Sequence, residues 1–156
     1  MAKVIVYTDG SSRGNPGSGG YGVVLISGDH KKELAEGFRH TTNNRMELLS
    51  VIVALESLKG LDHQVLIYSD SKYVVDAVEK KWVFGWQKKA FKGKKNADLW
   101  NRFLRIYPKH DVRFKWVKGH AGNHYNERCD ELAVDAATSS ELKQDAVFER
   151  ENGFSE

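Results

Sequence analysis

The sequence predicts an α/β fold with a mixed five-stranded sheet: three antiparallel N-terminal strands, then parallel strands, with helices on both faces. Residues 3–40 hold three stretches predicted as strands, the first of them rich in β-branched residues, separated by turn residues at spacings that favour an antiparallel meander. From residue 44 onward helical and strand patterns alternate, and strands connected through helices pair in parallel. The 156 residues, 40% of them hydrophobic, suffice for one core, so we expect a single domain over residues 1–140 and a polar, loosely held tail over residues 141–156.

The N-terminal part of the chain is predicted as strands. Residues 3–8 contain the apolar run Val-Ile-Val-Tyr and should form a buried strand. A long turn rich in Gly, Ser and Asn is expected over residues 9–20. Residues 21–26 and 32–40 are predicted as two further strands, joined through a turn at residues 27–29.

The apolar period then changes to that of a helix. Residues 44–58 place apolar side chains on one helical face, and Gly60 should end this helix. The later elements are expected as a strand at 65–68, helices at 71–80, 82–86 and 98–106, a strand at 112–117 and a helix at 126–137. Functional sites in such sheets lie at carboxyl ends of strands, near a switch in strand order. Asp9 and Asp70 follow the strands at 3–8 and 65–68, so these strands must be neighbours if the two acids are to meet in one functional site.

Composition limits the class of protein. The single cysteine, Cys129, excludes an internal disulfide, and its expected role is packing on a helix. No apolar run approaches the length of a membrane span, and the first six residues lead directly into a strand rather than resembling a signal peptide. We expect a cytoplasmic monomer with no membrane contact and no obligate protein partner.

Positive charge is concentrated in one segment. Seven lysines and no acid lie between Lys80 and Lys95, although the net charge of the whole chain is only +3. A solvated surface would explain lysines alone, but aromatic residues interleave with them: Trp82, Phe84, Trp86 and Phe91. That combination favours contact with a nucleic-acid backbone together with stacking.

Four carboxylates occupy positions where strand ends or helix starts would present them: Asp9, Glu47, Asp70 and Asp130. Carboxylate oxygens are the ligands that Mg²⁺ prefers, and converging carboxylates would repel one another without a cation. Each acid also has a simpler interpretation. Asp9 could begin an Asp-Gly turn, Glu47 could complete a capping box with Asn44 as N-cap, Asp70 could cap the following helix, and Asp130 could be a surface acid.

Five stretches resemble the bacterial ribonuclease HI family, in the family's order and over roughly residues 2–138. They are TDGSSRGNPGSGGYG (8–22), TTNNRMEL (41–48), YSDSKYV (68–74), KNADLW (95–100) and WVKGHAGNHYNERCDELA (116–133). The resemblance implies the ribonuclease H-like fold and metal-dependent endonucleolytic cleavage of the RNA strand of RNA–DNA hybrids. The products would carry 5′-phosphate and 3′-hydroxyl ends, and no sequence specificity is expected.

The resemblance also implies roles for the acids. Asp9 would bridge two Mg²⁺ ions bound with substrate, for which Mn²⁺ could substitute. Glu47 and Asp70 would hold one ion, and Asp130 the other. His120, in a Gly/Ala-flanked loop, would assist proton transfer or product release, whereas the nearby His124 is interpreted as an ordinary surface histidine.

Substrate contacts follow from the same likeness. Asn15, Asn43 and Asn44 would contact sugars, phosphates or bases, and Thr42 a DNA phosphate. The lysine-rich segment resembles the family's handle, which grips the DNA strand, and the matching residues are Trp82, Trp86, Lys88, Lys89 and Asn96. Trp82 and Trp100 could instead anchor the core.

Three departures from the family bear on affinity rather than chemistry. Lys72 stands where a glutamine often contacts a base, and His40 stands where an arginine often contacts phosphate. The loop between Trp86 and Asn96 is shorter than in well-known members.

Two other functions remain open at this point. A non-catalytic hybrid-binding module would not need four intact acids. A nuclease acting on a DNA strand with the same fold would not need the asparagine-rich motifs and the lysine segment.

Overall fold

A computed structural model describes residues 2–118 and 123–153 of the chain. One five-stranded sheet has the strand order β3-β2-β1-β4-β5. Its strands are β1 (Lys3–Arg13), β2 (Gly17–Ser27), β3 (His30–Thr41), β4 (Gln64–Ser69) and β5 (Asp111–Trp116). The first three pair antiparallel, and β4 pairs in parallel with both β1 and β5. The predicted mixed sheet is confirmed.

The β1–β2 hairpin is longer than the sequence predicts. The supposed turn at residues 9–20 is mostly paired strand, with Asp9 opposite Gly22 and Ser12 opposite Gly19. Only residues 14–16 form the turn itself. Asp9 therefore lies inside β1, and the Asp-Gly turn interpretation is wrong. Part of the reason for the glycines is packing: a Cβ on Gly22 would lie 2.3 Å from the Cys129 carbonyl oxygen of the helix below.

The predicted adjacency of the first and fourth strands is confirmed. Pairing of β1 with β4 runs from Lys3 opposite Gln64 to Tyr7 opposite Tyr68 and then stops. β4 ends at Ser69, one residue before Asp70. Strands β1 and β4 separate where Asp9 and Asp70 occur, so this end of the sheet is open for a site.

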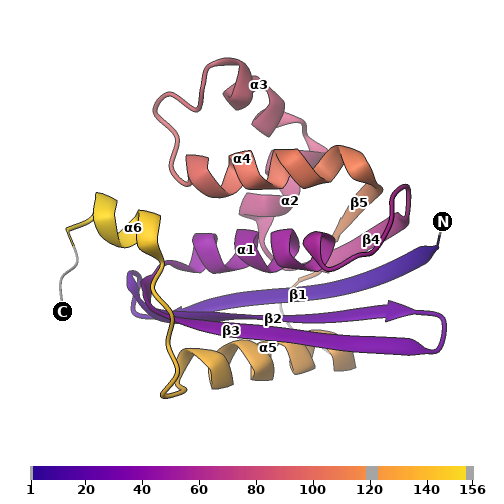
Figure 1. Ribbon diagram of the computed structural model, residues 1–156, viewed down its shortest axis with the longest axis horizontal. Coiled ribbons are helices and arrows are strands. Elements are labelled where there is room, and N and C mark those ends of the chain that lie inside the picture. The colour runs from indigo at the N-terminus through magenta and orange to yellow at the C-terminus, as the bar shows by residue number, and fades with distance from the viewer. Residues whose placement is uncertain (1, 119–122, 154–156) are drawn as a thin grey trace.

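Helices cover both faces of the sheet (Figure 1). They are α1 (Asn43–Glu56), α2 (Lys72–Glu79), α3 (Trp82–Lys88), α4 (Ala97–Ile106), α5 (His124–Ala137) and α6 (Ala146–Glu151). Helix α5 lies along one face, whereas α1 lies on the other beneath α4, and α3 is the outermost element (Figure 1). Helix α5 starts two residues earlier than predicted because Asn123 caps it, accepting hydrogen bonds from the backbone N–H of Tyr125 and Asn126.

The core lies between α1 and the sheet and continues under α4. The apolar positions predicted for the first helix, Leu48, Val51, Ile52 and Leu55, are all fully buried. Trp100 is fully buried as well, which confirms a core role for this tryptophan, whereas Trp82 is 48% exposed. Cys129 is buried and its thiol donates to the Tyr7 carbonyl oxygen at 3.2 Å, so its predicted packing role is confirmed. In the part of the chain that is described, no helix is both long and apolar enough to cross a bilayer.

The C-terminal segment is not loosely held, contrary to the expectation for residues after 139. The backbone of Lys143 pairs with Gly37 and Arg39 of β3, and α6 follows. Glu149 accepts a two-pronged ion pair from Arg39 at 2.7–3.2 Å, and Asp145 accepts from the Thr41 hydroxyl at 2.8 Å. The tail is polar as predicted, but its acids are buried against cations about 100 residues away in the sequence.

Candidate active site

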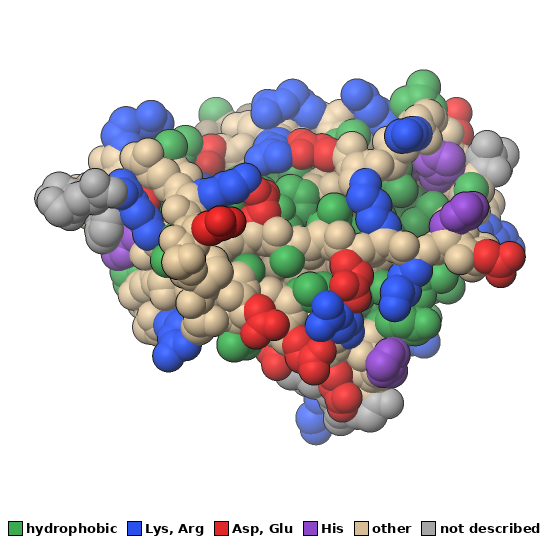
Figure 2. Space-filling view, turned by 60° about the horizontal axis from the view of Figure 1, so that its bottom comes forward, with side chains coloured by type: hydrophobic (Ala, Val, Ile, Leu, Met, Phe, Trp, Pro, Cys, Tyr) green, Lys and Arg blue, Asp and Glu red, His purple; other side chains and the backbone are tan. Residues whose placement is uncertain are grey.

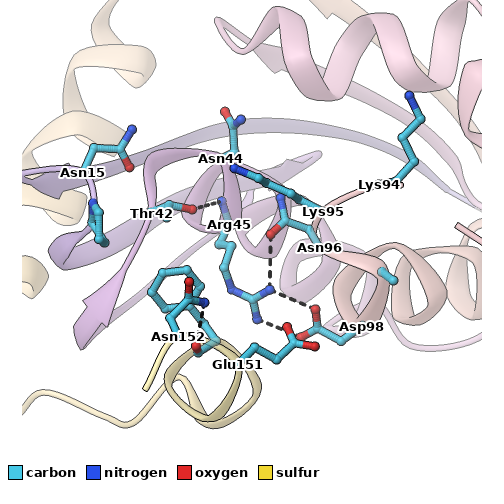
Figure 3. Close-up of a pocket in the computed structure, with 13 residues that line it drawn as sticks. Asn15, Thr42, Asn44, Arg45, Lys94, Lys95, Asn96, Asp98, Glu151 and Asn152 are labelled. Carbon is cyan, nitrogen blue, oxygen red and sulfur yellow. Dashed lines mark hydrogen bonds and ion pairs between the residues drawn. The ribbon is translucent and has the colours of Figure 1, made fainter. Parts of the chain in front are cut away.

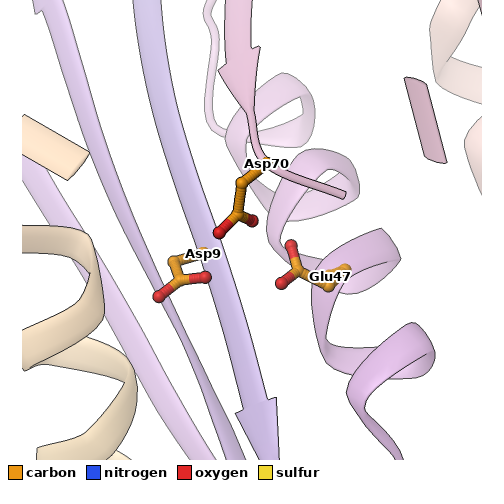
Figure 4. A group of neighbouring side chains, drawn as sticks. All are labelled: Asp9, Glu47 and Asp70. Atoms are coloured by element: carbon orange, nitrogen blue, oxygen red, sulfur yellow. The ribbon is translucent and has the colours of Figure 1, made fainter. Parts of the chain in front are cut away.

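Three of the four predicted acids meet at the open end of the sheet. Asp9 from β1, Glu47 from α1 and Asp70 after β4 each offer a carboxylate oxygen, and these oxygens lie within 4.8 Å of one another (Figure 4). Asp130, in the second turn of α5, lines the same basin of about 400 Å³. The predicted convergence of the acids is thus a property of the fold.

Glu47 reaches this position because α1 approaches β1 very closely. A Cβ on Gly10 would lie 2.4 Å from the backbone nitrogen of Glu47, so only glycine fits next to Asp9. The helix is capped by Thr42, whose hydroxyl accepts from the backbone N–H of Arg45 at 3.2 Å. The capping-box interpretation, with Asn44 as N-cap, is therefore wrong, and the Glu47 carboxylate is directed into the basin instead.

Asp70 is not a helix cap either. Ser71 caps α2, with its hydroxyl accepting from the backbone N–H of Val74 at 3.3 Å. The carbonyl oxygen of Asp70 accepts from the indole N–H of Trp116, the last residue of β5, at 3.1 Å. The main chain at Asp70 is thus tied to both neighbouring elements.

The carboxylates disfavour one another's charge. Burial raises the pKa of Asp9 to about 8, and the charges of Asp70 and Asp130 add to the rise. Burial, followed by the charges of Asp9 and Asp70, holds the pKa of Glu47 well above its usual range. Glu47 Oε2 is buried and has no hydrogen-bond partner among the residues described. A buried oxygen without a partner among the described residues, beside other carboxylates, fits a hard divalent cation, which would supply the missing positive charge.

These shifts predict how stability depends on pH in the absence of metal. The folded-state pKa of Asp9 exceeds its unfolded value, so the folded state binds more protons between about pH 4 and 8, and stability falls as pH rises through that window. Urea unfolding in EDTA should give a lower midpoint at pH 8.5 than at pH 5.5. Asp9→Asn should flatten this dependence. An identical slope in both proteins would contradict the assigned repulsion.

Two polar pockets adjoin and hold most of the predicted substrate residues. Asn43, Asn44 and Lys72 line the carboxylate basin. Asn44 also lines a second pocket of about 520 Å³, together with Asn15, Thr42 and Asn96 (Figure 3). Asn44, in the first turn of α1, therefore lies between the two pockets.

The asparagines are held by the hairpin turn and helix start. Asn15 Oδ1 accepts from the Asn43 backbone N–H at 3.2 Å, and Asn43 Oδ1 accepts from the backbone N–H of Ser12 at 2.6 Å. Among the described residues only the Oδ1 atoms of Asn15 and Asn43 take part in these hydrogen bonds, which leaves their Nδ2 groups as donors for a sugar or phosphate. His120 falls within residues 119–122, outside the described part of the chain.

The predicted handle residues stand apart from the acids. Trp82, Trp86, Lys88 and Lys89 belong to α3 and its C-terminal cap, and they line neither polar pocket. Trp86 packs edge-on against Trp100, with ring centroids 6.0 Å apart, and Lys94 Nζ lies 4.8 Å from the centroid of the Trp86 ring. Lys94 and Lys95 line the second pocket and so connect α3 to it. The view turned by 60°, which brings the bottom of the molecule in Figure 1 forward, shows acidic and basic side chains intermixed on the described surface (Figure 2).

Arg45 organises the second pocket, and the sequence patterns gave no role to it. The side chain is almost fully buried, and its guanidinium forms ion pairs at 2.7–2.8 Å with Asp98 and Asp145. It also donates to Asn96 Oδ1 at 3.3 Å (Figure 3). Arg45 thereby joins the start of α1, the start of α4 and the C-terminal segment. A cation in the first turn of a helix that is mostly apolar from Leu48 onward was the available signal, but its partners are far away in the sequence.

Comparison with known proteins gives a consistent result. The family model described as RNase H matches residues 1–138. A protein of Rippkaea orientalis named Ribonuclease H is 51% identical over 152 residues, which cover 94% of this chain and 93% of that protein. The crystal structure of LC9-RNase H1, a type 1 RNase H with the type 2 active-site motif, aligns with a TM-score of 0.80 and 35% identity, covering 88% of this chain and 72% of that one. LC11-RNase H1 in complex with RNA/DNA hybrid aligns with a TM-score of 0.61 and 26% identity, covering 86% of this chain and 96% of that one.

Proposed function

This chain belongs to the ribonuclease H family and is a hydrolytic nuclease, and on that premise we propose that it cuts the RNA strand of RNA–DNA hybrids internally, by two-metal-ion catalysis. The observation that carries the proposal is the meeting of Asp9, Glu47 and Asp70 oxygens within 4.8 Å, with Glu47 Oε2 lacking a partner among the described residues. Such a set of hard oxygen donors suits Mg²⁺, with Mn²⁺ as a substitute.

The chain's residues would divide the chemistry as follows. Asp9 would bridge both cations, Glu47 and Asp70 would hold one, and Asp130 the other. When bound, the cations supply an activated water and stabilise the departing 3′-oxygen, which leaves 5′-phosphate and 3′-hydroxyl ends. His120, ten residues before Asp130 in the sequence, would assist proton transfer or product release.

The two adjoining pockets suggest how a hybrid is read. Asn43, Asn44 and Lys72 surround the carboxylates and would face the RNA strand and the minor groove, where 2′-hydroxyls are displayed. Thr42 and Asn96 line the second pocket with Asn15, and this pocket would receive a phosphate of the DNA strand. Contacts of this kind fix the duplex without reading its bases, so no sequence specificity is expected.

We assign the DNA-gripping role to α3 and its lysines, and this gives a prediction. Lys88→Gln/Lys89→Gln should raise KM more than it lowers kcat, because these exposed lysines lie away from the acids. The plot of log affinity against log salt concentration should become shallower by up to about two units, nearly one for each phosphate that the variant no longer binds. Lys31→Gln/Lys32→Gln, at the far end of β3, is the charge-matched control. An unchanged KM and salt slope would remove the handle assignment.

We propose further that the protein acts as a cytoplasmic monomer whose catalytic domain spans residues 1–140, with residues 141–153 docked on it. Size-exclusion chromatography coupled to light scattering tests the monomer. A dimer mass at micromolar concentration would contradict it.

Substrate choice is tested with four duplexes of one sequence: RNA–DNA hybrid labelled on the RNA strand, the same hybrid labelled on the DNA strand, RNA–RNA and DNA–DNA. The proposal predicts internal cuts only in the RNA of the hybrid. Cuts in the DNA strand would favour the related nuclease function, and binding without cleavage would favour a hybrid-binding module.

A further inference from the structure

Trp116 contacts two parts of the candidate site at once. It is the last residue of β5 and is 40% exposed, unlike the core tryptophan Trp100. Its indole N–H donates to the Asp70 carbonyl oxygen at 3.1 Å. The Lys72 ammonium nitrogen lies 4.7 Å from the centroid of its ring. The Trp116 side chain thus contacts the main chain of Asp70 and the ammonium group of Lys72, and both residues line the carboxylate basin.

The local structure fixes this arrangement. Parallel pairing places Trp116 directly opposite Ser69, and the backbone N–H of Val117 donates to the Ser69 carbonyl oxygen at 2.9 Å. The turn from Asp70 to Lys72 therefore passes beside the indole before α2 begins at Lys72. A large aromatic side chain that is exposed adds little to the core, so the hydrogen bond and the cation–π contact of Trp116 indicate its role better than its packing does.

The two contacts have different physical consequences. A hydrogen bond from Trp116 to the Asp70 carbonyl restrains the backbone that carries the Asp70 carboxylate. A ring face holds an ammonium group by cation–π attraction, which restricts a long and otherwise mobile lysine to one location. Lys72 is thereby held at the rim of the basin that Asp9, Glu47, Asp70 and Asp130 line.

We propose that Trp116 is a positioning residue for the nuclease reaction. Its N–H fixes the Asp70 main chain for cation binding, and its ring places the Lys72 ammonium where it contacts a phosphate of the strand that is cut. The inference rests on the proposed function and deepens it, because it assigns two separable tasks to one side chain outside the carboxylate set.

Four variants and one remote control separate the tasks. Trp116→Phe keeps a ring for Lys72 but loses the N–H, so the Mg²⁺ concentration for half-maximal rate should rise several-fold with KM for hybrid unchanged. Lys72→Met should raise KM by about two- to five-fold with the Mg²⁺ requirement unchanged, and Lys72→Arg should restore KM. Trp116→Leu should show both effects. Lys31→Met, a remote loss of one charge, should leave both quantities unchanged.

The coupling between the two residues is the sharper measurement. In the Trp116→Leu background, adding Lys72→Met should raise KM no further, since the ring that positions the ammonium is already absent. Calorimetric titration with Mn²⁺, without substrate, should show weaker binding for Trp116→Phe than for the wild type. Thermal unfolding of each variant establishes that it is folded.

The inference would be overturned if Lys72→Met and Trp116→Leu changed KM independently, so that their effects multiplied in the double variant. It would also be overturned if Trp116→Phe bound Mn²⁺ as tightly as the wild type. In either case, cleavage of the hybrid by the wild type would leave the proposed function standing. Wild-type protein that does not cut the hybrid would overturn both.

Discussion

Asp9→Asn is expected to lower kcat for hybrid cleavage by at least about 10³-fold while hybrid binding is retained. Asp9 is the acid with neighbours on both sides: Asp70 and Asp130 both raise its pKa, and its oxygen lies within 4.8 Å of those of Glu47 and Asp70. An amide removes one negative charge from the centre of the set and can ligate through only one oxygen. Neither change touches Asn43, Asn44 or the second pocket.

The same substitution should stabilise the protein measured in EDTA. Burial and two neighbouring carboxylates raise the pKa of Asp9 to about 8, so near neutral pH the folded state must hold this carboxyl protonated or bear the repulsion of its charge, and replacement by Asn removes that cost. A gain on the order of 1–3 kcal/mol in the free energy of unfolding is expected. Added Mg²⁺ should raise the Tm of the wild type and have little effect on the variant.

Asp135→Asn provides the matched control for both measurements. Asp135 is an exposed acid on the same helix as Asp130, and it lines none of the carboxylate basin. Its replacement should change neither kcat nor stability in EDTA appreciably. Cleavage above a trace level by Asp9→Asn, or a loss of stability in EDTA, would contradict the role given to Asp9.

Arg45→Met should have the largest effect on stability of any change outside the apolar core. The guanidinium is almost fully buried and holds Asp98 and Asp145 through hydrogen bonds of 2.7–2.8 Å. Removing one member of a buried ion pair leaves the other charges without compensation, at a cost of about 3–5 kcal/mol. A domain of this size would lose roughly 10 °C in Tm. Chemical and thermal unfolding at pH 7 measures both quantities.

The chain offers a matched control in Arg102, which forms a two-pronged ion pair with Glu56 but is 39% exposed. Arg102→Met should cost less than about 1 kcal/mol. The double variant Arg45→Met/Asp145→Asn should recover part of the loss, because it removes one stranded carboxylate. Equal losses for Arg45→Met and Arg102→Met would contradict the importance given to the buried cluster.

The fold was largely predictable because its strongest signals are periodic. Leu48, Ile52 and Leu55 define the buried face of α1, and the apolar run at residues 4–7 defines a strand at the centre of the sheet. The hairpin arms within residues 9–20 were predicted as a turn because glycines such as Gly10 and Gly20 resemble loop residues. Their absent side chains instead make room for the backbones of α1 and α5, a contact that only the assembled fold shows.

The site divides in the same way. The convergence of Asp9, Glu47 and Asp70 could be predicted, because Asp9 and Asp70 lie just beyond the last β1–β4 pair and Glu47 lies near the start of the helix that packs on β1. Two features could not be predicted: the capping of α1 by Thr42, and the burial of Asp145 and Glu149 in the supposed tail. Polar contacts between segments about 100 residues apart leave no periodic trace in the sequence. The contacts of Trp116 could not be predicted either, since its hydrogen bond to Asp70, 46 residues away, depends on the register of β4 and β5.

The most direct test of the two-metal hydrolysis is the chemistry of the cut ends. A hybrid with a defined RNA strand is incubated with wild-type protein and Mg²⁺, or with EDTA, and the RNA fragments are analysed by mass spectrometry. Activated water attacking the phosphate predicts Mg²⁺-dependent fragments with 5′-phosphate and 3′-hydroxyl ends, and none in EDTA. Fragments with 2′,3′-cyclic phosphate ends, or the same fragments in EDTA, would contradict metal-activated hydrolysis at the four carboxylates.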